Sequence, residues 1–152
     1  MEPQITPAMA KRIEFWRLDR LVPFARNART HSDEQVAQIA ASIAAFGFNN
    51  PVLVDTNAGI IAGHGRFLAA RKLGLDEIPV VVLDHLSETQ KRAYILADNR
   101  IGENAGWDED VLAADLVDLQ NADLPLDLLT FSDGEIERLL GDALPQKAVA
   151  GR

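Results

Sequence analysis

The chain has 152 residues, a net charge of −8 and no cysteine, with 47% hydrophobic and 25% charged residues. This is the composition and length of one ordinary globular domain, and the lack of cysteine excludes disulfides, thiolate metal sites and cysteine nucleophiles. No apolar run approaches the ~20 residues of a membrane span. The first residues, MEPQITPAMAKR, lack the apolar core of a secretion signal, so we expect a cytoplasmic protein that does not enter membranes.

The first third of the chain predicts one strand and one helix after a leader. Residues 1–12 contain two prolines and little periodicity, which indicates a flexible leader. A weak alternation predicts a strand over residues 13–17. Ser32 followed by Gln35 predicts a capping box at a helix start, and Gly47 is well placed to end that helix.

The middle of the chain predicts three strands around a glycine-containing loop and a helix. The loop is Gly63-His64-Gly65-Arg66, and it leads directly into a helical segment that Gly74 ends. Turn residues over 55–59 separate the first two strands. The three predicted strands are 51–54, 60–62 and 78–83.

The last third predicts helices only. Ser87 with Gln90 forms a second predicted capping box, opening a helix that ends near Asn99 and Arg100. Two further helix starts are predicted at Asp108 and at the pair Ser132 and Glu135.

Together these elements predict an α+β fold: a small mixed β-sheet with helices, followed by a helical C-terminal extension. We expect four regions along the chain. They are a flexible leader over 1–12, an α+β domain over 13–104, an acidic helical extension over 105–144 and a disordered tail over 145–152.

The segment Gly63-His64-Gly65-Arg66 has the chemistry of an anion site. A helix start exposes free N–H groups and the positive end of the helix dipole. Gly63 and Gly65 allow the backbone to approach a phosphate, because no Cβ intervenes. Arg66 adds a forked donor that suits phosphate oxygens, and His64 can add a donor or shape the loop. The alternative is a tight turn whose arginine meets a carboxylate at the edge of the core.

Several motifs in the same order resemble the ParB/sulfiredoxin superfamily, over roughly residues 18–100. They are Leu21-Val22-Pro23 with Asn27-Ala28-Arg29, then NNPVLV, IIAGHGRFLAARKLG and IPVVVL. The segment LSETQKRAYILADNRIGENAGWDEDVL resembles a subfamily found beside DNA methyltransferase domains in phages and prophages. The resemblance implies a ParB/sulfiredoxin-like fold.

The resemblance also implies residue roles at the loop. Partition proteins of this superfamily hold nucleotide phosphates with a G-E-R-R-x-R-A box, which Gly63 and Arg66 match. His64 stands in the glutamate position and Gly65 in that of the first arginine. Sulfiredoxins have a cysteine where this chain has His64, so their reductase chemistry is excluded.

A second box of those relatives, E-N-x-x-R, helps to bind Mg²⁺ and triphosphate. Asp98-Asn99 resembles its start, whereas Gly102 stands in the arginine position. The resemblance therefore implies Asn99 as a nucleotide-binding residue, and Asp98 with Asn99 as the residues that meet Mg²⁺ carried by a nucleoside triphosphate, CTP or ATP.

The two halves of the chain differ in charge. Residues 1–76 carry nine basic against seven acidic residues, and residues 77–152 carry six against sixteen. Nucleic-acid binders usually show a basic footprint, so we expect this chain to meet DNA weakly or only through a partner. Any direct contact would come from the basic residues Lys11, Arg12, Arg17, Arg20, Arg26 and Arg29.

The predicted function is a ParB-type nucleotide- or phosphate-binding module acting in DNA modification or partition through a partner or fused domain. A DNA methyltransferase or another phage or DNA-processing protein is the expected partner, and a homodimer is left open. One alternative is an NTP-dependent phosphotransferase or NTPase using the same loop, and another is a degenerate protein-interaction scaffold. The chain has no D-P-P-Y or N-P-P-Y tetrapeptide, so it is not itself a methyltransferase of that type, and no catalytic residue is assigned.

Overall fold

The computed structural model describes residues 7–23 and 30–141. The chain divides into two compact units, Met1–Gly102 and Glu103–Arg152. The predicted tail over 145–152 lies outside the described residues, as does the first half of the predicted leader. Within the described ranges, no helix combines the length and the hydropathy that a bilayer crossing requires.

The first unit is built on a four-stranded mixed sheet in the order β1-β4-β2-β3. The central strands β2 and β4 run parallel, and each outer strand is antiparallel to its neighbour. The four predicted strands are confirmed with small shifts in their ends. The bounds are Glu14–Arg17 for β1, Val52–Val54 for β2, Ile60–Ala62 for β3 and Glu77–Val82 for β4.

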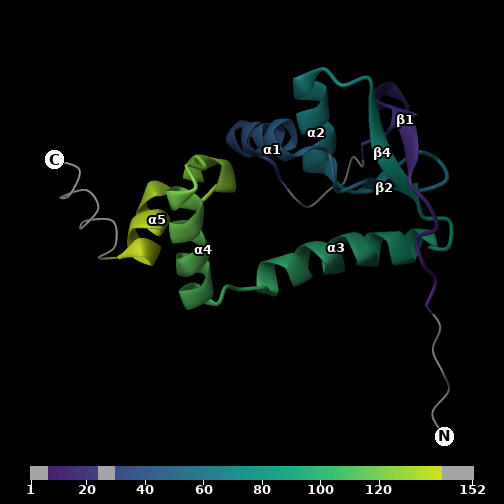
Figure 1. The fold of residues 1–152 in the computed structure, drawn as a ribbon. Helices are drawn as coiled ribbons and strands as arrows, with labels where there is room; N and C mark the ends of the chain where they lie inside the picture. Colours follow the sequence, from purple (N-terminus) through teal and green to yellow (C-terminus); the bar gives the residue numbers. More distant parts are fainter. Residues whose placement is uncertain (1–6, 24–29, 142–152) are drawn as a thin grey trace, which may run out of the picture. The chain divides into compact units, whose positions relative to one another are not determined.

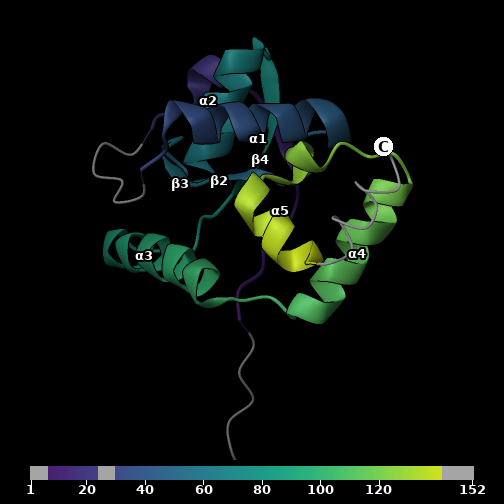
Figure 2. The ribbon, with the colours of Figure 1, turned by 90° about the vertical axis from the view of Figure 1, so that its left-hand side faces the viewer.

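Two helices cover one face of the sheet, α1 (Asp33–Phe46) and α2 (His64–Leu73). Figures 1 and 2 show both on the same side of the strands. Burying their apolar side chains against the strands is the main source of stability for such a unit. This core contains Trp16, Leu21, Val52, Val54, Ile60, Phe67, Ala70, Ile78 and Val80.

The opposite face of the sheet is covered by α3 (Glu88–Asn104). Ile95 of α3 is buried in one cluster with Ile61 of β3, Val81 of β4 and Leu83, which directly follows β4. The predicted end of this helix near Asn99 is wrong, because the helix continues for five more residues. Asn99 is tolerated inside it since its side-chain amide donates to the Ile95 carbonyl at 2.9 Å.

The N-cap predicted at Asp108 is confirmed, and the predicted capping boxes hold at two of three helices. Ser87 with Gln90 and Ser132 with Glu135 exchange both hydrogen bonds of a capping box. At α1, the Ser32 hydroxyl accepts from the Gln35 N–H, but the Gln35 side chain turns away to bond His31. The predicted capping box is therefore only half formed there.

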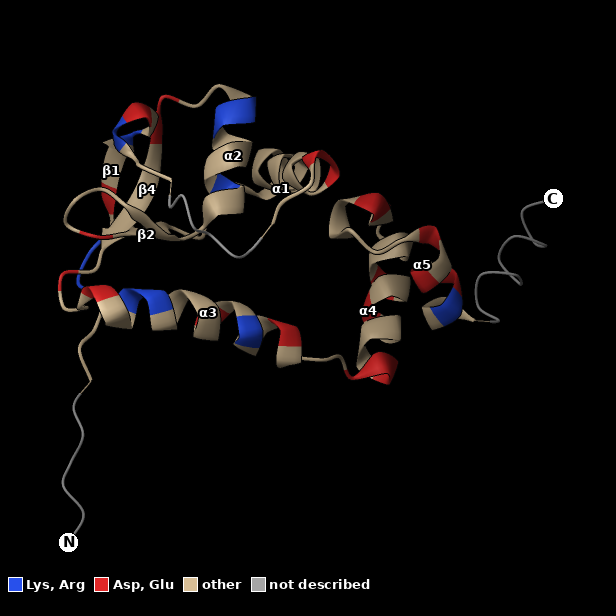
Figure 3. Cartoon of the chain, turned by 180° about the vertical axis from the view of Figure 1, so that it is seen from behind, with Lys and Arg blue, Asp and Glu red and all other residues tan. Residues whose placement is uncertain are grey.

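The second unit contains helices α4 (Glu109–Asn121) and α5 (Asp133–Leu140) and the short 3₁₀ helix η2 (Leu126–Leu129). Leu112, Leu116 and Leu140 form its core. The charged residues of α4 and α5 are acidic except for Arg138 (Figure 3), and Arg138 pairs with Glu109 at 2.6 Å. The predicted α+β fold class with C-terminal helices is confirmed.

Candidate anion-binding site

The loop of interest is the first turn of α2, directly after β3. Gly63 is the N-cap residue, in the left-handed region with φ of 102°, and no side chain caps the helix there. A Cβ at Gly63 would lie 2.9 Å from Arg66 Nη2 and 3.1 Å from Val52 Cγ2. Glycine is therefore required by both the backbone angle and the space. The strand–loop–helix arrangement follows the sequence prediction.

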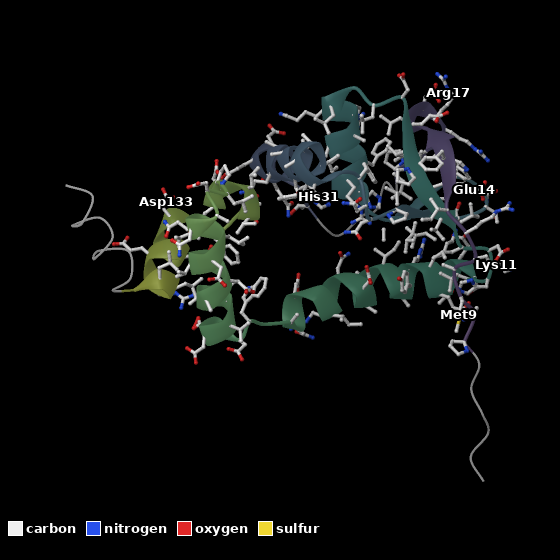
Figure 4. All side chains as sticks on the ribbon, in the orientation of Figure 1. Met9, Lys11, Glu14, Arg17, His31 and Asp133 are labelled. Carbon is white, nitrogen blue, oxygen red and sulfur yellow. The ribbon has the colours of Figure 1, made fainter. Side chains whose placement is uncertain are left out.

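Gly65 is required for a different reason, the close packing of α2 on its neighbours. A Cβ at this position would lie 2.7 Å from the Ile39 side chain of α1 and 3.1 Å from the ring of His31. Glycine at position 65 thus allows α1 to approach the first turn of α2. Figure 4 labels His31 in this region.

Arg66 is a half-buried cation whose hydrogen bonding is incomplete. Its Nη2 donates to the carbonyl oxygen of Pro51 at 3.1 Å. Its Nε is buried and has no hydrogen-bond partner among the described residues. Burial lowers the pKa of Arg66, and the carboxylate of Asp98 acts in the opposite direction. The fold has thus taken a permanent positive charge out of water and compensated it only in part.

His64, the next candidate, is neutral at physiological pH. Burial, together with a smaller effect of the nearby His31, lowers the pKa of His64 from 6.5 to about 4. The protonated form that could add a charged donor is therefore disfavoured, and His64 offers a neutral imidazole with one N–H group.

His31 is a neighbour of the loop that the sequence reasoning missed. Its Nδ1 lies 2.8 Å from Gln35 Oε1, which can only accept, so Nδ1 carries the proton. No local motif marks this residue, since it lies more than thirty positions before the glycine that it contacts.

Asp98 and Asn99 both lie on α3. Asp98 is near enough to Arg66 to act on its pKa, and burial, with the charge of Asp98, raises the pKa of Tyr94. Asn99 uses its amide nitrogen within the helix, so its carbonyl oxygen is the atom left for a ligand.

A protein-only metal centre is not formed by the residues in the described ranges, where no three His, Asp or Glu side chains gather to hold an ion. Mg²⁺ is commonly held by one or two carboxylates together with substrate phosphates and water. Asp98, an oxygen ligand near the candidate phosphate loop, fits that second arrangement.

The basic residues of the N-terminal segment are mostly engaged with neighbours. Arg12 pairs with Glu14 at 3.8 Å and Arg17 with Asp19 at 3.4 Å. The guanidinium of Arg20 lies 3.6 Å from the centre of the Trp16 ring. Arg26 and Arg29 lie outside the described residues.

A hollow of about 430 Å³ lies in the first unit, between the later turns of α2 and the 3₁₀ helix η1 (Leu18–Arg20). Its lining mixes Arg17 and Arg71 with Asp19 and Asp76. Opposite charges there compensate one another, and none of the candidate loop residues lines it.

Comparison with known proteins gives a family match and close relatives. The model of the ParB N-terminal domain matches residues 3–100. The ParB-like nuclease domain-containing protein YnaK of Escherichia coli is 53% identical over 81 residues, which are 53% of this chain and 93% of YnaK. The probable chromosome 2-partitioning protein ParB of Deinococcus radiodurans is 40% identical over 79 residues, but these make up only 27% of that longer protein.

Solved structures share the fold at low sequence identity. A C-terminally truncated chromosome-partitioning protein ParB from Caulobacter crescentus, complexed with CTP-gamma-S, is similar with a TM-score of 0.68 at 18% identity. The similarity covers 93% of this chain and 86% of that one. A Pnob8-like ParB-N domain is similar over 86% of this chain and 60% of that one, with a TM-score of 0.51 at 20% identity. The expected ParB/sulfiredoxin-like fold is confirmed, and this chain belongs to the ParB N-terminal domain family.

Proposed function

We propose that the first unit binds the phosphates of a nucleoside triphosphate at the first turn of α2. The observation that carries this proposal is Arg66, a half-buried guanidinium whose Nε lacks a partner among the described residues. An uncompensated buried donor is costly, and a phosphate oxygen would supply the missing acceptor. The N–H groups of that turn have no side-chain cap, which leaves the start of the helix available to an anion.

Mg²⁺ is part of the proposal. A bound Mg²⁺ would neutralise charge between the phosphates and a protein carboxylate. Asp98 is the residue to hold it, with the carbonyl oxygen of Asn99 as a second oxygen ligand. Without the metal, the Asp98 carboxylate repels an incoming phosphate and competes with it for Arg66.

CTP and ATP are the first nucleotides to test. CTP is favoured by the relative from Caulobacter crescentus, which is complexed with CTP-gamma-S. His64 and Gly65 depart from the phosphate box of the partition proteins that the sequence resembles, so we expect weaker binding than a complete box would give.

Calorimetry with CTP, ATP and GTP, each with Mg²⁺, tests the proposal. One charged hydrogen bond contributes about 1.5–3 kcal/mol, so Arg66→Ala should lower the affinity about ten- to a hundredfold. Lys72→Ala is the matched control, because Lys72 is an exposed cation on the same helix. Equal binding by Arg66→Ala, once its folding is checked by circular dichroism, would place the site elsewhere.

We propose further that the module acts on DNA modification or partition through another protein. The partitioning relatives and the acidic second unit support an indirect role in DNA handling. A DNA methyltransferase, a terminase or a partition ATPase is expected in a neighbouring reading frame, and co-purification after co-expression is the test. Absence of any complex with these neighbours would contradict the indirect route.

A further inference from the structure

Helix α3 is fixed to the sheet by a shielded ion pair. Lys91 Nζ lies 2.7 Å from Asp55 Oδ2 and 2.6 Å from Glu88 Oε1. The side chains of Lys91 and Asp55 are only 13% and 15% exposed. The hydrogen bond to Asp55 and, to a smaller extent, that to Glu88 raise the pKa of Lys91. Such a pair is screened less by solvent than one on the open surface.

Asp55 is itself held rigidly in the turn between β2 and β3. Its Oδ1 accepts from the N–H groups of Asn57 at 2.8 Å and Gly59 at 2.9 Å. A Cβ at Gly59 would lie 2.8 Å from Asp55 Oδ2, so the turn closes tightly on the carboxylate. Burial alone would raise the pKa of Asp55, but the bonds from Lys91, Gly59 and Asn57 outweigh it and lower that pKa. Lys91 therefore meets an ionised partner that cannot move far.

One face of α3 links this ion pair to the candidate phosphate site. Lys91, Ile95 and Asp98 follow one another at intervals of four and three residues, which places them on the same side of a helix. Ile95 is buried against the sheet, and Asp98 acts on Arg66. At a rise of 1.5 Å per residue, Asp98 is about 10 Å along the helix from Lys91.

We infer that Asp55 and Lys91 are positioning residues for the nucleotide site: their ion pair sets α3 so that Asp98 faces Arg66. This inference rests on the proposed nucleotide-binding function. The apolar contact of Ile95 allows α3 to slide and rotate on the sheet, whereas the directional ion pair fixes both the position and the rotation of the helix. Loss of the pair loosens α3 and takes Asp98 out of reach of a metal held on the phosphates.

The experiment compares the Mg²⁺ dependence of nucleotide binding in three variants of Lys91 and its neighbour. Residues that orient a metal ligand without touching the metal typically change metal affinity by about 10–100-fold. The gain in CTP or ATP affinity on adding Mg²⁺ should therefore be about tenfold smaller in Lys91→Met than in the wild type. Lys91→Arg keeps the charge and should restore most of that gain. Arg92→Met removes one exposed cation from the same helix and should change binding by less than about twofold.

A double-mutant cycle separates positioning from simple stabilisation. If Lys91 acts through Asp98, Lys91→Met adds nothing to the Mg²⁺ dependence once Asp98→Ala is present. If Lys91→Met is unstable, Asp55→Asn tests the same pair, since its amide oxygen still accepts from the turn.

The outcomes distinguish the inference from the function on which it rests. Nucleotide binding with an unchanged Mg²⁺ gain in Lys91→Met would overturn the inference and leave the proposed function standing. Failure of the folded wild type to bind any of the nucleotides would overturn both.

Discussion

The first turn of α2 and the segment from Lys11 to Arg20 both contain arginine, but the side chains differ in their burial and in their partners. The side chains of Arg12 and Arg17 are 79% and 72% exposed, and each has a carboxylate partner close in sequence. Arg66 is half-buried and donates a hydrogen bond to a backbone carbonyl, while its Nε has no hydrogen-bond partner among the described residues. We therefore place the proposed anion site at the one cation whose partners are incomplete, and not at the local excess of basic residues.

This contrast can be tested through the tolerance of the two regions to small changes. One added methyl group or one added proton at the first turn of α2 should change the unfolding free energy strongly. The exposed N-terminal segment should tolerate the loss of whole charged side chains.

The largest effect is expected at Gly65. Gly65→Ala forces a methyl group against Ile39 and His31, and overpacking of this kind costs about 1–3 kcal/mol of unfolding free energy. Urea denaturation followed by circular dichroism measures the loss. Gly102→Ala in α3 is the control, because a Cβ there meets nothing within 4 Å and should stabilise the helix by about 0.5–1 kcal/mol. Equal stability of wild type and Gly65→Ala would show that α1 shifts away from the added methyl group without a loss of unfolding free energy.

A smaller effect is expected from protonation of His64. Its pKa is about 4 in the folded chain and about 6.5 in the unfolded chain. The unfolded state therefore binds the extra proton between these values, and the unfolding free energy falls as the pH falls from 6.5 to 4. The full shift corresponds to about 3 kcal/mol, which partial exposure reduces to about 1–2 kcal/mol.

Urea denaturation at pH 7.5, 6.5, 5.5 and 4.5 measures this loss. His64→Gln should flatten the curve in that window. His85→Gln, which changes an exposed histidine, should leave the curve unchanged. A wild-type curve that is already flat would mean that His64 titrates normally.

The smallest effect is expected in the N-terminal segment. Arg17→Ala should change nucleotide affinity by less than about twofold, since exposed ion pairs contribute little. The chain alone should also bind DNA weakly or not at all at 150 mM salt, because the sixteen acidic residues after residue 76 repel phosphates. Fluorescence anisotropy with labelled duplex DNA is the measurement. Sub-micromolar binding that Arg17→Ala weakens would reverse the contrast between the two regions.

Local features of the fold were predictable from the sequence. The strand–loop–helix unit around Gly63 and the cap at Ser87 depend on residues next to one another, and both were predicted. The end of α3 was misplaced, because a glycine inside a helix costs only about 1 kcal/mol and Asn99 finds a partner within its own helix.

Contacts between distant parts of the chain carried no such signal. His31 against Gly65 and Lys91 against Asp55 join residues more than thirty positions apart. No periodicity or spacing specifies such pairs, because tertiary packing brings them together. The candidate loop could therefore be named from the sequence, whereas the groups that surround it, His31 and the Lys91–Asp55 pair, came only from the structure.

The order of the strands has a consequence for synthesis on the ribosome. β1 emerges early, but its partner β4 is made far later, with Glu14 paired to Val80. The parallel neighbour of β4, β2, must wait as well, so only the β2–β3 hairpin can form from local contacts. Non-local pairing of this kind slows folding and leaves apolar side chains such as Trp16 uncovered on the nascent chain. The sheet therefore assembles only once β4 has left the exit tunnel, and a nascent chain stalled before Glu77 would lack the strand that joins β1 to the β2–β3 hairpin.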